Sequence, residues 1–405
     1  MPAYVYGKRA DDHPASRIPH FASRIMIIVY PANTTLPSSR ANTIQILHTV
    51  RELAAQGNEV HLIARKGNKS EQEIFEYYGL VSHQNLHLHL VSPRESIVLK
   101  ETLVVLGQRR NEEKILFTRD HLFADLLLKM RRLMNFKLVY EAHTLFFITA
   151  KETYMPIAWN EKKEKRIQKR ESRIFQRADG IVFITSSLKD FVREHFAVTQ
   201  PSQVIHDGTM VPSYQSVEQK SAQLLCYSGQ FYLWKGISTL LESLRWIDGA
   251  RLLMFGGNYS TVHDDMREMQ RIIVEHNLGE KVEFRGFVPP SQIQSEISKC
   301  NIGILPLPQN IIGNRCNSPL KLFDYMANGL AVVASDLLTV REIIHHGKNG
   351  HVVEPGNPKK LAEGINEVLT DASYRNRLTA AAFETVKEYS WQKRGEHLHQ
   401  FLSNI

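Results

Sequence analysis

Two lysines of this 405-residue chain stand where phosphate could bind. Serine is a preferred N-cap and proline suits the first helical position, so Ser318 and Pro319 predict a helix start. Lys321 then falls in the first turn, where a cation opposes the helix dipole unless an anion binds the free N–H groups. Lys235 lies near the start of another predicted helix, after the glycine-bearing loop in SGQFYLWKG. Both positions therefore indicate an anion site.

An ordinary surface ion pair is the alternative explanation for Lys321. Asp324 follows one turn later, and residues at this spacing share a helix face. Gly329 predicts the end of the helix, and residues 330–334 predict a short buried strand after it. The residues themselves favour neither explanation over the other.

Alternating strands and helices are expected to position these residues. Residues 24–30 have the pattern of a buried strand, residues 43–56 that of an amphipathic helix, and EVHLIA that of a second strand. This βαβ opening is typical of a doubly wound α/β sheet. The polar loop at residues 31–42 has no GxGxxG motif, so it does not indicate a dinucleotide site. The same alternation returns after residue 223.

The run SPLKLFDYMANGLAVVASD, residues 318–336, resembles the donor-binding signature of the retaining GT-B glycosyltransferases of glycosyltransferase family 4 (glycosyl transferases group 1). The resemblance implies two Rossmann-like doubly wound domains that face a central cleft. In that family Asp324 is usually Glu and holds the ribose hydroxyls of the donor nucleotide. Many members carry a second Glu, which holds the donor sugar, at the position of Cys316. The resemblance covers residues 24–405 and is strongest in 223–356.

The same resemblance assigns roles to single residues. Lys235 would meet the donor phosphates, and Gln230 stands where the family often has a second cation, an Arg. YEAHTLF resembles the family element whose His, here His143, reaches the donor sugar, although a lone His is more often structural. We therefore predict His143, Lys235 and Asp324 as catalytic residues. The predicted donor-binding residues are Gly229, Gln230, Phe287, Val288, Asn317, Ser318, Pro319, Leu320 and Lys321, with Phe287 and Val288 at the nucleobase.

Five parts make up the expected domain organisation. A polar, proline-containing extension covers residues 1–23, and an N-terminal Rossmann-like domain on the acceptor side covers 24–207. A polar linker without periodicity covers 208–222. The C-terminal Rossmann-like domain for the nucleotide sugar covers 223–388, and a last helix, 389–405, crosses back to the first domain.

Composition limits the classes of function. Hydrophobic content of 43% is normal for a globular protein, and the apolar stretches are too short to span a bilayer. A net charge of +8 permits anionic partners, but no helix-turn-helix, zinc-finger or RNA-recognition signature indicates nucleic acid. Three unevenly spaced cysteines fit a reducing cytoplasm. No DxD-type carboxylate pair follows a strand, so we predict a metal-independent site without a cofactor.

Residues 151–177 are heavily charged, and two interpretations stay open. Acidic and basic residues interleaved at helical spacing favour a solvated helix. The alternative is a basic face that contacts anionic lipid at the inner face of the membrane, with Tyr154, Met155 and Trp159 as anchors. We favour the solvated helix by about two to one.

The sequence thus predicts a retaining hexosyltransferase. It would move a sugar from a nucleotide-diphosphate sugar to a glycan, lipid-linked or small-molecule acceptor, and UDP is the commonest donor nucleotide in the family, followed by GDP. The resemblance implies attack on the face of the leaving group, with a diphosphate oxygen as base. The alternatives are a nucleotide-sugar epimerase or hydrolase of the same fold, and a non-catalytic nucleotide-sugar-binding partner subunit, which Cys316 and Gln230 keep open.

Overall fold

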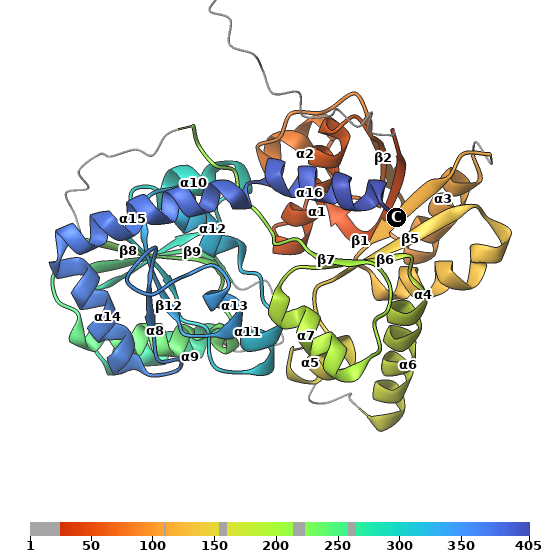
Figure 1. The fold of residues 1–405 in the computed structure, drawn as a ribbon. Coiled ribbons are helices and arrows are strands. Elements are labelled where there is room, and N and C mark those ends of the chain that lie inside the picture. Colours follow the sequence, from red (N-terminus) through yellow and green to blue (C-terminus); the bar gives the residue numbers. More distant parts are fainter. Residues whose placement is uncertain (1–24, 109–110, 154–159, 214–222, 258–264) are drawn as a thin grey trace, which may run out of the picture.

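Two parallel β-sheets, each flanked by helices, form the protein in the computed structural model (Figure 1). The structure describes residues 25–405 except 109–110, 154–159, 214–222 and 258–264. The predicted N-terminal extension and most of the predicted linker therefore lie outside the described residues.

The first sheet has seven parallel strands in the order β3-β2-β1-β4-β5-β6-β7. Its strands are β1 (Ile27–Leu36), β2 (Glu59–Lys66), β3 (Leu86–Val91), β4 (Lys114–Thr118), β5 (Phe136–Ala142), β6 (Gly180–Phe183) and β7 (Ser202–Val204). The helices of this half are α1 (Ala41–Ala55), α2 (Glu71–Tyr78), α3 (Glu95–Gly107), α4 (His121–Met130), α5 (Phe146–Thr153), α6 (Glu161–Arg177) and α7 (Ser186–His195).

The second sheet has six parallel strands in the order β10-β9-β8-β11-β12-β13. Its strands are β8 (Leu224–Gln230), β9 (Arg251–Gly257), β10 (Val282–Gly286), β11 (Ile302–Leu305), β12 (Ala331–Ser335) and β13 (His351–Val353). Its helices are α8 (Ile237–Ser243), α9 (Asp265–Glu275), α10 (Pro290–Ile297), α11 (Ile311–Arg315), α12 (Leu320–Ala327), α13 (Leu338–Arg341), α14 (Pro358–Thr370) and α15 (Ala372–Val386). Both doubly wound halves are thus as predicted.

Strand β1 is longer than predicted. The sequence analysis placed a polar loop from residue 31, but the chain stays paired with β2 as far as Leu36, with a register shift between Pro31 and Thr35. The polar side chains here find partners inside the protein, since Thr34 is buried and its hydroxyl lies 3.0 Å from that of Thr43. Internal hydrogen bonds therefore allow a polar segment to continue a strand.

The chain crosses between the halves at two places, and the two crossing segments are bonded to each other. The Thr209 N–H donates to the carbonyl of Tyr389 (3.0 Å), and the Trp391 N–H donates to the carbonyl of Thr209 (3.1 Å). A Cβ on Gly208 would lie 2.9 Å from the Tyr389 oxygen, so this approach requires glycine. Beyond the crossing, the last helix, α16 (Trp391–Ser403), packs along α1, and the rings of His48 and Trp391 stack.

Candidate functional site

A cavity of about 300 Å³ lies between the two halves. The carboxyl ends of β8, β9 and β11 form one wall, which is the edge where open α/β sheets bind ligands. The opposite wall comes from the first half and includes Ser39, Ile44, His48 and Tyr78. Trp391, at the start of α16, also lines the cavity.

Helix α12 presents its N-terminal end to this cavity, but it begins one residue later than predicted. Pro319 is the N-cap, in an extended conformation, and no side chain caps the helix. The prediction that Ser318 caps it is therefore wrong. The Ser318 hydroxyl is instead buried in the cavity wall, without a hydrogen-bond partner in the described part of the chain. The predicted residues Asn317 and Leu320 line the same wall.

Both predicted lysines face this cavity over aromatic rings. Lys321 Nζ lies 3.9 Å from the ring centroid of Tyr227, and Lys235 Nζ lies 5.3 Å from that of Tyr232 and 5.2 Å from that of Trp234. Neither ammonium group has a carboxylate partner among the described residues. The alternative of a surface ion pair between Lys321 and Asp324 is thus wrong.

The electrostatics of this lysine pair favour binding of an anion. Burial lowers the pKa of Lys235 to about 8. Burial, and then the positive charge of Lys235, hold the pKa of Lys321 well below its ordinary value. A buried charge is normally paired, and an unpaired one is costly. A diphosphate between the two ammonium groups would pair both of them.

Two glycines make room for these lysines. Gly229, the second-last residue of β8, has φ 134°, and a Cβ there would lie 3.1 Å from Lys321 Nζ. Gly236 follows Lys235 with φ 79°, and a Cβ there would lie 1.7 Å from the Pro306 carbonyl oxygen. Any other residue at either position would have a strained backbone. A side chain at 229 would also crowd the Lys321 ammonium group, and one at 236 would clash with the backbone of Pro306.

Asp324 lies one helical turn beyond Lys321 and also lines the cavity. Its Oδ1 accepts hydrogen bonds from Thr209 Oγ1 (2.5 Å) and from Gln294 Nε2 (3.4 Å). Burial raises the pKa of Asp324 to about 6, although both hydrogen bonds act in the opposite direction. Oδ2 accepts no hydrogen bond from the described residues, so it is available to a ligand.

The other predicted donor-binding residues lie at the same cavity. Gly229, Gln230, Phe287 and Val288 line it. Phe287 is 43% exposed, and its ring stacks on that of Tyr77 from the first half at a centroid distance of 6.4 Å. A flat apolar group such as a nucleobase could bind beside this partly exposed ring.

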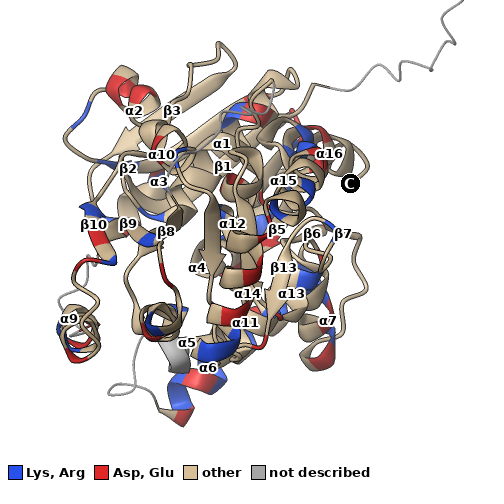
Figure 2. Cartoon of the chain, turned by 90° about the vertical axis from the view of Figure 1, so that its left-hand side faces the viewer, with Lys and Arg blue, Asp and Glu red and all other residues tan. Residues whose placement is uncertain are grey.

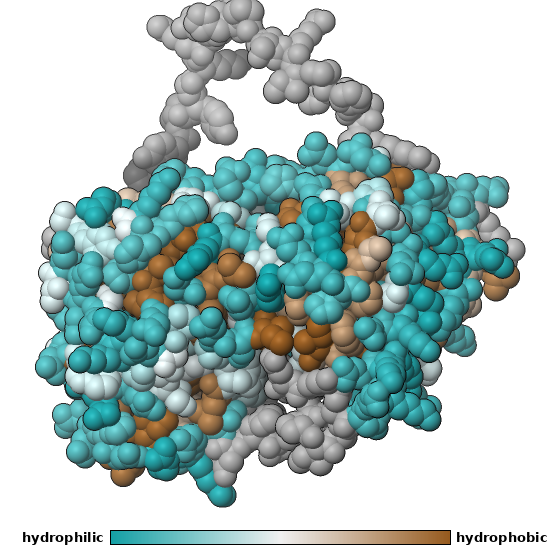
Figure 3. All heavy atoms as spheres, turned by 60° about the horizontal axis from the view of Figure 1, so that its bottom comes forward, coloured by the Kyte–Doolittle hydropathy of each residue, from teal (hydrophilic) through white to brown (hydrophobic). Residues whose placement is uncertain are grey.

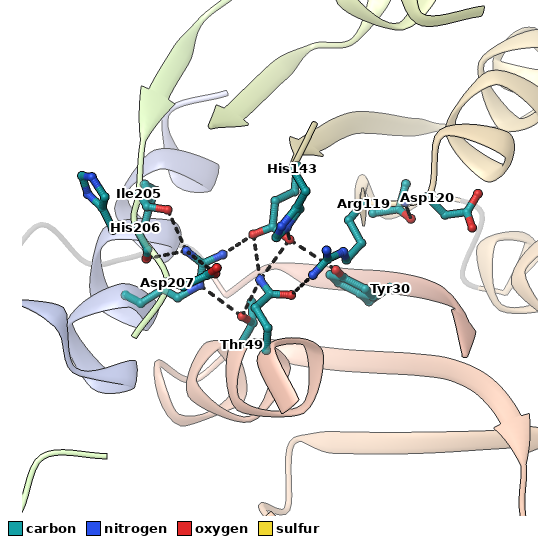
Figure 4. A network of polar contacts seen from close by, with 12 residues as sticks. Tyr30, Thr49, Arg119, Asp120, His143, Ile205, His206 and Asp207 are labelled. Carbon is teal, nitrogen blue, oxygen red and sulfur yellow. Dashed lines mark hydrogen bonds and ion pairs between the residues drawn. The ribbon is translucent and has the colours of Figure 1, made fainter. Parts of the chain in front are cut away.

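His143 is the predicted site residue that the structure does not bring to the cavity lining. It lies just beyond β5, and its Nε2 is 3.0 Å from Glu141 Oε2 (Figure 4). Burial, and then the charge of Arg119, lower the pKa of His143. The imidazole therefore belongs to a buried polar network in the first half of the protein.

Glu141 is the centre of that network and is fully buried. It accepts hydrogen bonds from Gln45 Nε2 (3.1 Å) and Arg394 Nη2. The Arg394 Nη1 also donates to the carbonyls of Ile205 and His206, both at 2.7 Å. Burial alone would raise the pKa of Glu141, but the charges of Arg394 and the nearby His hold it far below its ordinary value. This network fixes α16 to the first sheet.

Cys316, which stands where relatives carry a sugar-binding Glu, does not line the cavity. Its side chain is 6% exposed and belongs to the hydrophobic cluster of the first half, with residues such as Phe147 and Phe191. The neighbouring Arg315 pairs with Glu194 of α7 at 3.3 Å. Residue 316 therefore helps to join the two halves.

Helix α6 covers most of the charged segment. Ile167, Ile174 and Phe175 are buried, while acidic and basic residues alternate along the rest of the helix (Figure 2). On the face shown in Figure 3, hydrophobic side chains lie in separate patches among hydrophilic ones. The three predicted membrane anchors lie outside the described residues. Among the helices described, none is long and apolar enough to span a membrane.

Thr209, Gln294 and Trp391 were missed by the sequence analysis. Thr209 lies in a polar segment without periodicity, and Gln294 is one of several polar residues on α10. Trp391 belongs to a helix that returns from the far end of the chain. Only the resemblance to a two-domain fold with a returning helix could have pointed to any of them.

Two family models match this chain. The model described as Glycosyl transferases group 1 matches residues 213–385, and the model described as Glycosyltransferase Family 4 matches residues 43–209. The chain spans only about half the length, 57%, 43% and 40%, of the first curated relatives that it matches. A longer match is with the D-inositol 3-phosphate glycosyltransferase of Corynebacterium urealyticum, which is 23% identical over 89% of this chain and 90% of that protein.

Solved structures show the same fold. Sucrose-phosphate synthase from Thermosynechococcus elongatus matches with a TM-score of 0.75 and 19% identity, covering 94% of this chain and 99% of that one. Anabaena HepE, solved in complex with UDP-glucose, matches with a TM-score of 0.71 and 14% identity over 94% and 100% of the two chains. With the two family models, these matches show that the chain belongs to the GT-B glycosyltransferases of the family 4 type.

Proposed function

We propose that this protein is a retaining glycosyltransferase that moves a hexosyl group from a nucleotide-diphosphate sugar to an acceptor hydroxyl. The observation that carries this proposal is that Lys235, just before α8, and Lys321, in the first turn of α12, line one cavity without a carboxylate partner among the described residues. A diphosphate supplies the two negative charges that the site lacks. The buried Ser318 hydroxyl is a further donor to the same ligand.

The lysines would act most strongly on the leaving group. Cleavage of the glycosidic bond leaves an oxocarbenium-like sugar and a diphosphate whose negative charge grows in the transition state. Cations fixed in a partly enclosed cavity stabilise that growing charge without having to reorganise. The two lysines would thus take the role that a metal ion has in other transferases. We therefore propose a metal-independent mechanism.

Retention of configuration is part of this proposal because the chain resembles the retaining GT-B enzymes. The acceptor would attack the face from which the diphosphate leaves, and a diphosphate oxygen would take its proton. No side-chain nucleophile is required. The first-half wall of the cavity, with Ser39, Ile44 and Tyr78, would hold the acceptor, which we expect to be a glycan, a lipid-linked sugar or a small molecule.

The nucleotide would lie between α12 and the end of β10. Asp324 would accept hydrogen bonds from the ribose hydroxyls, and Phe287 and Val288 would contact the base. We propose UDP as the donor nucleotide, supported by its frequency in the family and by the UDP-glucose bound to the structurally similar HepE, with GDP as the second choice. That His143 orients the donor sugar stays a prediction, because here it contacts Glu141.

A thermal-shift screen tests this proposal. The ligands are UDP, GDP, ADP and their common sugar conjugates, each with and without EDTA. A ligand that binds only the folded protein raises the melting temperature by mass action. We expect a shift with UDP or UDP-glucose that EDTA leaves unchanged. No shift with any nucleotide would contradict the proposal, and a shift abolished by EDTA would contradict the metal-independent mechanism.

A further inference from the structure

The carboxylate of Asp324 links two features that are separate in the sequence. On one side it lines the cavity proposed for the donor. On the other side its Oδ1 accepts a 2.5 Å hydrogen bond from Thr209, which lies on the first segment that crosses between the two halves. The same residue therefore touches both the proposed ligand and the connection between the halves.

Gln294 completes this contact. Its Nε2 lies 3.0 Å from Thr209 Oγ1, 3.3 Å from the Met210 carbonyl oxygen and 3.4 Å from Asp324 Oδ1. The side chain thus joins α10, which also lines the cavity, to the crossing segment and to α12. Three elements meet at a single carboxylate oxygen.

Thr209 is held by its backbone as well as by its side chain. Its N–H and carbonyl bond to Tyr389 and Trp391 on the second crossing segment, as described above. The chain connects the two halves through these two paired segments. A rotation of one half against the other must therefore change the backbone of both segments. A shift of the Thr209 side chain is therefore transmitted to both of them.

We propose that Thr209 and Gln294 are positioning residues that hold Asp324 for the donor ribose and couple donor binding to the interdomain hinge. This inference rests on the proposed function. With Oδ1 held by Thr209 and Gln294, Oδ2 is oriented toward the cavity, where the ribose hydroxyls can donate to it. A ribose bound there fixes the carboxylate, and the fixed carboxylate holds Thr209 against the second crossing segment. Coupling of this kind is reciprocal.

The side-chain link also explains how a shorter residue could serve at position 324. The family residue is usually Glu, and Asp places its carboxylate one methylene nearer to the helix. The hydroxyl of Thr209 and the amide of Gln294 both donate to Oδ1 of that carboxylate and so hold it in place. In this chain, Thr209 and Gln294 would hold the Asp324 carboxylate in its binding position. This preorganisation would compensate for the shorter side chain.

The test uses Thr209→Val, which removes the hydroxyl and keeps the shape, in the full chain. Affinities for UDP and for 2′,3′-dideoxy-UDP are measured by calorimetry. We expect the wild type to prefer UDP by about tenfold and the variant to lose most of that preference, because its carboxylate is no longer oriented for the ribose hydroxyls. Thr102→Val is the matched control: Thr102 is a fully buried helical threonine of α3 that bonds only the carbonyl of Val98.

Hydrogen exchange measures whether nucleotide binding changes the two crossing segments. Saturating UDP should slow exchange at the amides of Thr209 and Trp391 in the wild type, and not in the variant. The amide of Ile205, which bonds to Phe183 inside the first half, serves as the reference. Unchanged ribose preference and unchanged protection in Thr209→Val would overturn the inference while leaving the proposed function intact. Failure of the wild type to bind any nucleotide would overturn both.

Discussion

Two buried charged clusters in this protein differ in whether their charges are paired. Glu141 and Arg394 pair with each other: the carboxylate accepts bonds from Gln45 and Arg394, and the guanidinium also bonds two backbone carbonyls. Around Lys235 and Lys321, the ammonium groups lie over aromatic rings without a carboxylate in the described part of the chain. The first cluster fastens α16 to the first sheet, and we propose that a ligand supplies the partner of the second.

This difference separates residues that serve stability from residues that serve function. Pairing a buried charge within the protein favours the folded state only when its partners stay in place. An unpaired buried charge lowers the stability of a protein. Such a charge is retained where a ligand supplies its partner. Substitutions at Glu141 or Arg394 should therefore mainly lower the free energy of unfolding. Substitutions at Lys235 or Lys321 should mainly weaken ligand binding.

The largest expected effect is on stability, in Arg394→Met. Removing the guanidinium leaves Glu141 buried without its main partner, so the free energy of unfolding should fall by about 3–5 kcal/mol. Denaturant unfolding followed by circular dichroism measures this loss. The exposed residue Arg132, changed to Met, is the control and should stay within about 0.5 kcal/mol of the wild type. A loss below about 1 kcal/mol in Arg394→Met would show that the network contributes little.

Lys321→Met should weaken donor binding and leave the free energy of unfolding nearly unchanged. Affinity for UDP-glucose should fall about 10- to 100-fold, because a charge-assisted phosphate contact contributes roughly 1.5–3 kcal/mol. The free energy of unfolding should stay within about 1 kcal/mol of the wild type, since the lost cation–π contact is offset by the removal of an unpaired charge. Lys299→Met, in the exposed turn after α10, is the control. Wild-type affinity in Lys321→Met would remove Lys321 from the donor site.

Titration of Asp324 should make donor binding depend on pH. Its pKa is raised to about 6, and only the ionised carboxylate accepts hydrogen bonds at both oxygens. Affinity for UDP-glucose should therefore increase as the pH rises through about 6, and Asp324→Asn should bind several-fold more weakly without that increase. UDP-glucose is the right probe because it has no terminal phosphate that titrates near pH 6. A pH profile that is identical in the two proteins would contradict the assignment.

The same raised pKa has a consequence for folding. From about pH 4 to about pH 6 the folded state keeps a proton on Asp324 that the unfolded state has released. The contribution of Asp324 to the free energy of unfolding should therefore fall over this range, and Asp324→Asn should remove that part of the pH dependence. Unfolding experiments at pH 4.5 and 7 on both proteins measure the difference.

Ser318→Ala should show the smallest effect. The hydroxyl is buried without a partner in the described chain, so its loss should leave stability unchanged or slightly higher. If it donates to the diphosphate, affinity for UDP-glucose should fall about threefold, which corresponds to one neutral hydrogen bond. Titration calorimetry resolves this change. Unchanged affinity would indicate that the diphosphate lies nearer to the lysines than to Ser318.

The sequence allowed the parallel sheets and the donor-side residues to be predicted because their signals are local. Lys321 and Asp324 share one short helix, and the glycine at 229 precedes Lys235 by six residues in one loop. The cap at Ser318 was predicted wrongly because the extended Pro319 takes that position. His143 was assigned from a motif, but in the structure it contacts Glu141, which in turn pairs with Arg394 from the far end of the chain.

The sequence by itself determined the two doubly wound sheets, the family and the positions of Lys235 and Lys321 near predicted helix starts, because alternating hydrophobicity and helix-start chemistry act within a few residues. Only the tertiary structure decided that the lysines lack carboxylate partners, that Cys316 packs into the first half, and that Thr209 and Gln294 meet Asp324. The Thr209–Asp324 contact alone joins residues that are 115 positions apart. Burial and pairing of that kind depend on how whole layers pack, which a local pattern does not encode.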